Sequence, residues 1–145
     1  MGVSSALRGR KSLLSMSGAA HNKPLVSVIV STHNAEASIR RAIESIHGQT
    51  YDHYEIVAVD DESTDRTFSL LSAIADRDVR MQALSTSSRG IRSALELALS
   101  RCDGDYVLVL DQDGWAEPAL LSEGVRMAEE NNLELVVGGF SLGVH

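Results

Sequence analysis

The sequence predicts an α/β domain built on an open, mostly parallel sheet with helices on both faces. Five apolar runs of strand length alternate with four amphipathic segments between Leu25 and Val137. The apolar runs are continuous and do not alternate with polar residues, which is typical of strands that are covered on both faces. The chain has 145 residues, of which 43% are hydrophobic, and this is enough for one core but leaves no room for a second full domain.

The first half of the domain begins with a β-branched run. Leu25–Val30 is the first predicted strand, and Asn34 is placed to cap the helix that follows it. The apolar residues of that helix recur at three- and four-residue spacing, and Gly48 is expected to end it. Tyr54–Val59 is the second predicted strand, and Asp65 is placed to cap the second helix.

The second half continues the same alternation. A short strand is predicted around Val79–Leu84, a third helix from Ile91 to Leu99, and the most strongly apolar strand over Tyr106–Leu110. Pro118 suits the first turn of a fourth helix that runs to about Asn131, and Leu133–Val137 is the fifth predicted strand.

This order of elements also predicts where a ligand binds. Right-handed crossovers favour the strand order 3-2-1-4, in which the winding reverses between the first and fourth strands. Ligands of open α/β sheets bind outside the carboxyl ends of the strands at such a reversal.

Charge and composition exclude several classes of protein. The formal net charge is −7, which disfavours a nucleic-acid-binding surface, and no apolar run approaches the roughly 18 residues that a transmembrane helix needs. Residues 1–23 hold four basic residues and no acid, so we expect a flexible basic tail followed by the domain at 24–145. The last lysine is Lys23, which excludes a P-loop nucleotidase. We expect a cytoplasmic location.

Polar residues gather after three of the predicted strands. Ser31–Asn34 follow the first strand, Asp60–Asp65 the second, and Asp111–Gly114 the fourth. Two carboxylates about 4 Å apart repel by roughly 4 kcal/mol at an effective dielectric constant of 20, so such a cluster needs a cation, hydrogen-bond donors or a raised pKa. An Asp-x-Asp spacing suits Mg²⁺ or Mn²⁺. The alternative is that these residues form turns and helix caps, where Asp and Asn are common.

Several of these segments together resemble a known family. They look like the N-terminal half of a family 2 glycosyltransferase with the GT-A fold, and the segments are Val26–Asn34, Ser45–Gln49, Glu55–Asp65, Gly104–Tyr106 and Leu110–Asp113. The resemblance implies that Ser31 and His33 line a nucleoside pocket, that Asp60 contacts the base, and that Asp61 contacts the ribose region.

The resemblance also implies a metal site and shows departures from the family pattern. Asp111 and Asp113 would hold Mg²⁺ or Mn²⁺ against the donor diphosphate. The family usually has an aromatic residue where His33 stands. The segment that leads into the third helix keeps Gly90 and Ala94 but has Leu95 and Glu96 at the last two places of the family motif, and Arg89 or Arg92 is a candidate to contact a donor phosphate instead.

The expected function follows from these residues. The protein would transfer a sugar from a nucleoside diphosphate sugar to the hydroxyl of an unknown acceptor, although the segment that carries the family's general base is missing. The alternative is a truncated, non-catalytic nucleotide-binding or interaction module, and a homodimer would cover an exposed sheet edge. The expected metal ligands are Asp111 and Asp113, and the expected donor-binding residues are Ser31, His33, Asp60, Asp61, Arg89, Gly90 and Gln112.

Overall fold

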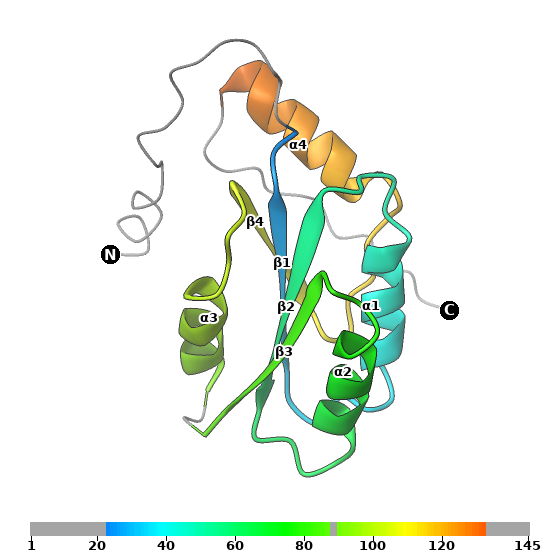
Figure 1. Ribbon diagram of the computed structural model, residues 1–145, viewed down its shortest axis with the longest axis vertical. Helices are drawn as coiled ribbons and strands as arrows, with labels where there is room; N and C mark the ends of the chain where they lie inside the picture. The colour runs from blue at the N-terminus through cyan, green and yellow to red at the C-terminus, as the bar shows by residue number, and fades with distance from the viewer. Residues whose placement is uncertain (1–22, 88–89, 133–145) are drawn as a thin grey trace.

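The computed structural model describes residues 23–87 and 90–132 as an alternation of strands and helices (Figure 1). This confirms the predicted α/β class. The elements are β1 (Val26–Thr32), α1 (Ile39–His47), β2 (Tyr54–Asp61), α2 (Thr67–Ala75), β3 (Met81–Thr86), α3 (Ile91–Leu99), β4 (Tyr106–Asp111) and α4 (Leu120–Asn131).

The four described strands form one parallel sheet in the order β3-β2-β1-β4, as predicted. In the register, Val26 of β1 lies opposite Tyr54 of β2 and Tyr106 of β4. The predicted fifth strand, Leu133–Val137, lies outside the described residues, as does nearly all of the predicted basic tail. No helix within 23–87 and 90–132 has the length and apolarity to cross a membrane.

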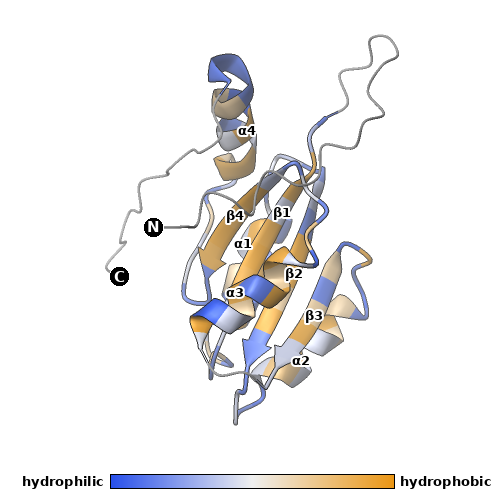
Figure 2. Ribbon diagram, turned by 90° about the vertical axis from the view of Figure 1, so that its left-hand side faces the viewer, coloured by the Kyte–Doolittle hydropathy of each residue, from blue (hydrophilic) through white to orange (hydrophobic). Residues whose placement is uncertain are grey.

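Helices cover both faces of the sheet (Figures 1 and 2). Side chains of α1, α2 and α4 pack against one face, around the fully buried Val28 and Val30 of β1. The helix α3 packs against the other face through Ala94 and Ala98, which meet Ile29 of β1 and residues of β2. The apolar side chains of the central strands are therefore buried under helices on both faces of the sheet. This burial is the largest stabilising contribution in such a fold.

The strand β4 is less buried than its sequence suggests. It lies at the edge of the described sheet, and α3 packs mainly on β1 and β2, with Val107 as the β4 residue packed against the same cluster. Val109 is consequently 49% exposed, although Leu110 on the opposite face is buried. No strand in the described part of the chain pairs with the outer edge of β4, and the homodimer expected to cover such an edge stays a prediction.

Two predicted helix caps have different outcomes. Asn34 does not cap α1, which begins five residues later at Ile39 with Ser38 before it. Asn34 instead takes a left-handed conformation with φ of 47°, and its side-chain oxygen accepts a hydrogen bond from the Thr64 N–H at 2.8 Å. Asp65 is not the N-cap residue of α2 either, since Arg66 takes that position, but its carboxylate accepts the N–H of Thr67, the first residue of α2, at 2.9 Å.

A closed hydrogen-bond network holds the amino end of the sheet. The Ser27 hydroxyl, which is fully buried, donates to Glu55 at 2.5 Å and accepts the N–H of Gly104 at 2.9 Å. A Cβ atom on Gly104 would lie 2.5 Å from the Ser27 hydroxyl and 2.6 Å from the Ser27 backbone nitrogen, so only glycine fits this position. The segment Gly104–Tyr106 therefore has a structural role in positioning β4 beside β1.

Candidate functional site

His33 joins the carboxyl ends of three strands. Its backbone N–H donates to the Gln112 side-chain oxygen at 2.7 Å, and its Nδ1 lies 2.6 Å from the Asp61 carbonyl oxygen. Since a carbonyl only accepts, Nδ1 carries the ring proton and Nε2 accepts from the Asn34 amide at 3.2 Å. The predicted meeting of the loops that follow β1, β2 and β4 is thus seen in the structure.

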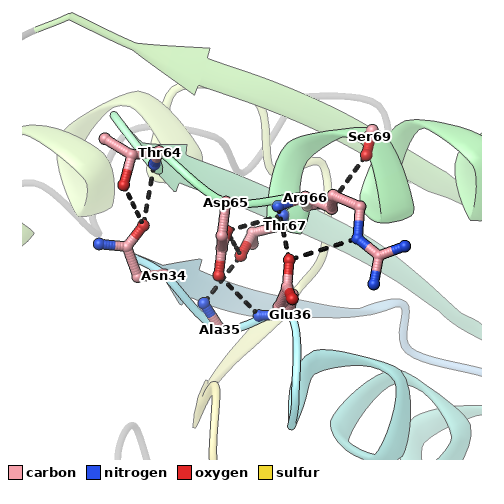
Figure 3. A network of polar contacts seen from close by, with 8 residues as sticks. All are labelled: Asn34, Ala35, Glu36, Thr64, Asp65, Arg66, Thr67 and Ser69. Carbon is pink, nitrogen blue, oxygen red and sulfur yellow. Dashed lines mark hydrogen bonds and ion pairs between the residues drawn. The ribbon is translucent and has the colours of Figure 1, made fainter.

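The loops after β1 and β2 are also bonded to each other (Figure 3). The Ala35 N–H donates to the Thr67 hydroxyl at 2.7 Å, and the Glu36 N–H donates to Asp65 at 3.2 Å. In return, the Arg66 N–H donates to the Glu36 carboxylate at 2.8 Å. The hydrogen bond from the Thr67 hydroxyl lowers the pKa of Asp65 below its usual value. These bonds make one rigid wall of the site.

Asp60 lies at the base of the site and is only 3% exposed. One of its carboxylate oxygens accepts hydrogen bonds from the hydroxyls of Thr32 and Ser63, at 3.2 and 2.5 Å, and the other accepts the Ser63 N–H at 3.1 Å. This carboxylate is already satisfied by protein donors, so in this structure it ties the end of β1 to the turn after β2.

Asp61, the next residue, is bonded quite differently. Its Oδ2 accepts the N–H of Gly90 at 2.9 Å, whereas its buried Oδ1 has no hydrogen-bond partner among residues 23–87 and 90–132. Gly90 precedes α3 with φ of 116°, a conformation that favours glycine. An unpaired buried acceptor costs roughly 1–3 kcal/mol, so Asp61 is a strained feature of this strand end. Arg89 lies outside the described residues.

The carboxylates of Asp111 and Asp113 lie exposed at the end of β4. Neither side chain has a hydrogen bond or ion pair within the described ranges. The turn between them is tight, because the Gly114 N–H donates to the Asp111 carbonyl at 2.8 Å and a Cβ on Gly114 would lie 2.9 Å from that oxygen. Ser31 lies beside Asp111 in the register of β1 and β4.

The carboxylates of Asp111 and Asp113 fit a divalent cation that takes its remaining ligands from a substrate and from water. The described residues contain no group of three or more His, Cys, Asp or Glu side chains that could hold a metal ion by themselves. Mg²⁺ typically binds through one or two carboxylates together with waters and substrate phosphates. Two free, exposed carboxylates match that partial donor set.

Sequence reasoning assigned no role to Ser45 and Gln49, which hold the segment that follows Asp113. The Gln49 amide donates to the Glu117 carbonyl at 2.7 Å and accepts the N–H of Leu121 at 3.0 Å. The Ser45 hydroxyl accepts the Ala116 N–H at 3.0 Å. The only signal was their place in the family resemblance, since these contacts join residues about 70 positions apart.

Comparisons with known proteins agree with this geometry. The family model described as glycosyl transferase family 2 matches residues 27–142. An uncharacterized glycosyltransferase of Haemophilus influenzae is 37% identical over 120 residues, which is 82% of this chain and 37% of that protein. The putative teichuronic acid biosynthesis glycosyltransferase TuaG of Bacillus subtilis is 33% identical and matches over 83% of this chain and 48% of its own length.

Solved structures show the same relationship. S. aureus TarS 1–349 in complex with UDP-GlcNAc has a TM-score of 0.68 and 26% identity, over 74% of this chain and 32% of that one. The mannosyltransferase PcManGT from Pyrobaculum calidifontis, in complex with GDP-Man and Mn²⁺, has a TM-score of 0.67 and 31% identity, over 74% and 33%. The chain spans less than half the length of these relatives. It belongs to glycosyltransferase family 2 and has the fold of the N-terminal part of GT-A enzymes.

Proposed function

We propose that this chain forms the donor-binding part of a glycosyltransferase, which transfers a sugar from a nucleoside diphosphate sugar to an acceptor hydroxyl with Mg²⁺ or Mn²⁺. The observation that carries the proposal is that His33 joins the turn after β4, which holds the exposed Asp111 and Asp113, to the end of β2, where Oδ1 of Asp61 has no hydrogen-bond partner among the described residues. The complexes of TarS with UDP-GlcNAc and of PcManGT with GDP-Man and Mn²⁺ support it.

Asp61 is the proposed recognition group for the nucleoside. Its free oxygen would accept an N–H of the base or an O–H of the ribose, and Ser31 and His33 would line the same pocket. The family resemblance implied that Asp60 contacts the base. In this proposal Asp60 instead supports the pocket, because its carboxylate accepts hydrogen bonds from the hydroxyls of Thr32 and Ser63. This arrangement holds the pocket in place before the donor arrives, which lowers the entropic cost of binding.

The donor diphosphate would lie toward the end of β4. A bound divalent cation would stabilise the charge that gathers on the departing diphosphate. Asp111 and Asp113 would hold this cation, and Gln112 links their turn to the nucleoside wall through the His33 N–H. Gly90 borders the pocket through its bond to Asp61, and Arg89, its neighbour in the sequence, is proposed to contact a donor phosphate.

A second candidate function is donor binding without sugar transfer. It is favoured by the state of the acidic residues on α4, which engage in local pairs. Glu123 and Glu130 both pair with Arg126, at 2.9 and 2.8 Å, and Glu129 accepts a hydrogen bond from the Tyr106 hydroxyl. That bond and burial raise the pKa of Tyr106 to about 12. Each of these three carboxylates therefore already has a partner on the protein.

Thermal unfolding with UDP-sugars and GDP-sugars, each with and without Mn²⁺, tests the proposal. We expect at least one donor to raise the melting temperature in a Mn²⁺-dependent manner. The double variant Asp111→Asn/Asp113→Asn should lose the Mn²⁺-dependent rise in melting temperature. Glu44→Gln, which removes an exposed charge on α1, should keep this rise. A release assay for free sugar then separates transfer or hydrolysis from binding alone. If no donor stabilises the protein with Mn²⁺, both candidate functions fail.

A further inference from the structure

We propose that Trp115 is an acceptor-binding residue whose indole ring stacks against a sugar ring, so that the acceptor is a carbohydrate. The inference rests on the proposed function, and it names the class of molecule that receives the sugar. Trp115 is the only tryptophan in the sequence and follows Asp113 by two positions. Its side chain is 48% exposed, although tryptophan is highly buried on average.

Trp115 lies close to the proposed cation. Consecutive Cα atoms are about 3.8 Å apart, so the Cα atoms of Asp113 and Trp115 are separated by at most about 7 Å. The Gly114 N–H donates to the Asp111 carbonyl at 2.8 Å, which keeps this part of the chain in one tight turn. The indole ring is therefore within reach of a molecule that reacts at a diphosphate bound to the cation.

The backbone is held in place on both sides of Trp115. On one side, a Cβ atom on Gly114 would lie 2.9 Å from the Asp111 carbonyl oxygen, so a side chain there would force the turn open. On the other side, Ala116 is 3% exposed, and its N–H donates to the Ser45 hydroxyl of α1 at 3.0 Å. A ring on a fixed backbone loses little conformational freedom when a ligand stacks on it, which favours binding.

Packing inside the fold does not account for the indole ring. Ala116 belongs to a buried cluster of the described residues, whereas Trp115 belongs to none of these clusters. The indole N–H also makes no hydrogen bond with any residue of 23–87 and 90–132. The ring therefore presents both an apolar face and a free hydrogen-bond donor to solvent.

This combination favours a sugar ring as the ligand. One face of a pyranose carries mainly C–H groups, which stack on an aromatic ring, while its hydroxyls hydrogen-bond with polar groups nearby. The exposed carboxylates of Asp113 and Glu117 flank Trp115 in the sequence and can accept hydrogen bonds from such hydroxyls. A lipid surface would need a wide apolar patch, but Trp115 is the only large apolar side chain exposed within residues 110–126.

The acceptor sugar is favoured over the donor sugar because the donor has other anchors. In the proposed function, Asp61 holds the nucleoside and the cation holds the diphosphate. The acceptor has no such link, so the chain must hold it within reach of the donor. Gln112 bonds to His33 on the nucleoside side, whereas Ala116 bonds to α1 as the chain passes that helix (Figure 1). Trp115 therefore lies toward the end of the turn that faces away from the nucleoside.

The intrinsic fluorescence of the full chain tests this proposal, because selective excitation of tryptophan reports on Trp115 alone. The probes are the disaccharides chitobiose, cellobiose and mannobiose, titrated without nucleotide and again with UDP and Mn²⁺. We expect at least one disaccharide to change the emission in a saturable manner. Glycerol, a polyol without a ring, should leave the emission unchanged.

Variants assign the binding to the indole ring. NMR signals of the disaccharide protons measure the affinity, since this readout does not need tryptophan. Trp115→Ala should weaken binding about tenfold, and Trp115→Phe, which keeps an aromatic ring, about threefold or less. Met127→Ala is the matched control, because Met127 is 42% exposed but lies on α4 outside the turn. It should change the affinity by less than about twofold, and all three variants should keep the wild-type melting temperature.

Three results would overturn the proposal. They are unchanged emission with every disaccharide, equal losses of affinity in Trp115→Ala and Met127→Ala, and a Trp115-dependent preference for UDP-GlcNAc over UDP without disaccharide. The last result would assign the ring to the donor sugar. The titration without nucleotide does not depend on donor binding, so failure of this inference and failure of the proposed function are separate results.

Discussion

At the amino end of the sheet the buried hydroxyl of Ser27 donates to Glu55 and accepts from Gly104, whereas at the carboxyl end the buried Oδ1 of Asp61 has no partner in the described part of the chain. The two regions terminate the same parallel strands and use similar polar side chains. Completed hydrogen bonds indicate a structural role, because the protein itself offsets the cost of burial. Incomplete ones mark the side chain on which the proposed donor contact depends.

The same contrast recurs between two consecutive residues. Asp60 accepts three hydrogen bonds from Thr32 and Ser63, while Asp61 accepts one from Gly90 and keeps a free oxygen. Successive side chains of a strand point to opposite faces, so neighbours in the sequence have different surroundings. The role of a carboxylate in this fold depends on its available donors and not on its place in a motif.

Gly104→Ala is the strongest test of the structural end. The new Cβ would overlap Ser27 atoms that include a backbone nitrogen, which cannot move aside alone. We expect a loss of about 2–3 kcal/mol in the free energy of unfolding, measured by urea denaturation. Gly124→Ala is the matched control, since a Cβ there meets nothing within 4 Å and replaces a glycine inside α4. It should stabilise the protein by up to about 1 kcal/mol, and equal losses in both variants would contradict the account.

Asp60→Asn tests whether a carboxylate at the open end is structural. An amide presents an N–H₂ group to one of the donors from Thr32 or Ser63, which leaves a donor facing a donor. We expect a loss of about 1–3 kcal/mol in the free energy of unfolding. Denaturation with the wild type run in parallel measures it. An unchanged stability would mean that Asp60 is free for a ligand after all.

Unlike Asp60→Asn, Asp61→Asn should weaken donor binding without destabilising the protein. The amide oxygen can still accept the Gly90 N–H, and the variant no longer buries a charge that lacks a second partner. We expect the free energy of unfolding to stay the same or to rise by up to about 1 kcal/mol, while donor affinity falls about tenfold. Calorimetric titration of the donor nucleotide with Mn²⁺ measures the affinity. Wild-type affinity in this variant would remove Asp61 from the proposed pocket.

The arrangement of the sheet was predictable because it follows from general rules. Alternating apolar runs indicated the parallel strands, and right-handed crossovers gave the observed order. The exposure of Val109 was not predictable. An apolar run indicates that a strand is packed, but it does not show which of its residues the helix α3 leaves exposed. Asn34 was predicted as a cap because asparagine favours both caps and left-handed turns, and the tertiary bond to Thr64 decided between them.

The meeting of the loops after β1, β2 and β4 was predictable, but the hydrogen-bond partners of the individual carboxylates were not. Strand ends placed the loops that contain His33, Asp61 and Gln112 at one mouth, and their hydrogen bonds join them there. Asp60 takes two of its three hydrogen bonds from Ser63, three residues along the chain, whereas the Gly90 N–H that bonds to Asp61 lies 29 positions away and is not evident from the local sequence. The anchoring by Gln49 depends on a contact with Leu121 across 72 positions, which a reading of local sequence cannot detect.

A substitution of Asp65 should have the smallest effect on stability of these variants. Its carboxylate makes structural hydrogen bonds but lies near the surface. Its pKa is lowered in the folded protein, chiefly by the Thr67 hydroxyl, so the folded state binds this proton less readily than the unfolded state. The resulting stabilisation is complete above the unfolded pKa of about 4 and is lost as the pH falls through the folded value. Asp65→Asn should therefore flatten the fall in stability between pH 5 and about pH 2, measured by urea denaturation at several pH values. Asp76→Asn, at the exposed end of α2, should leave the slope unchanged, and a wild-type slope in Asp65→Asn would show that the bond from the Thr67 hydroxyl adds nothing to the stability of the folded state.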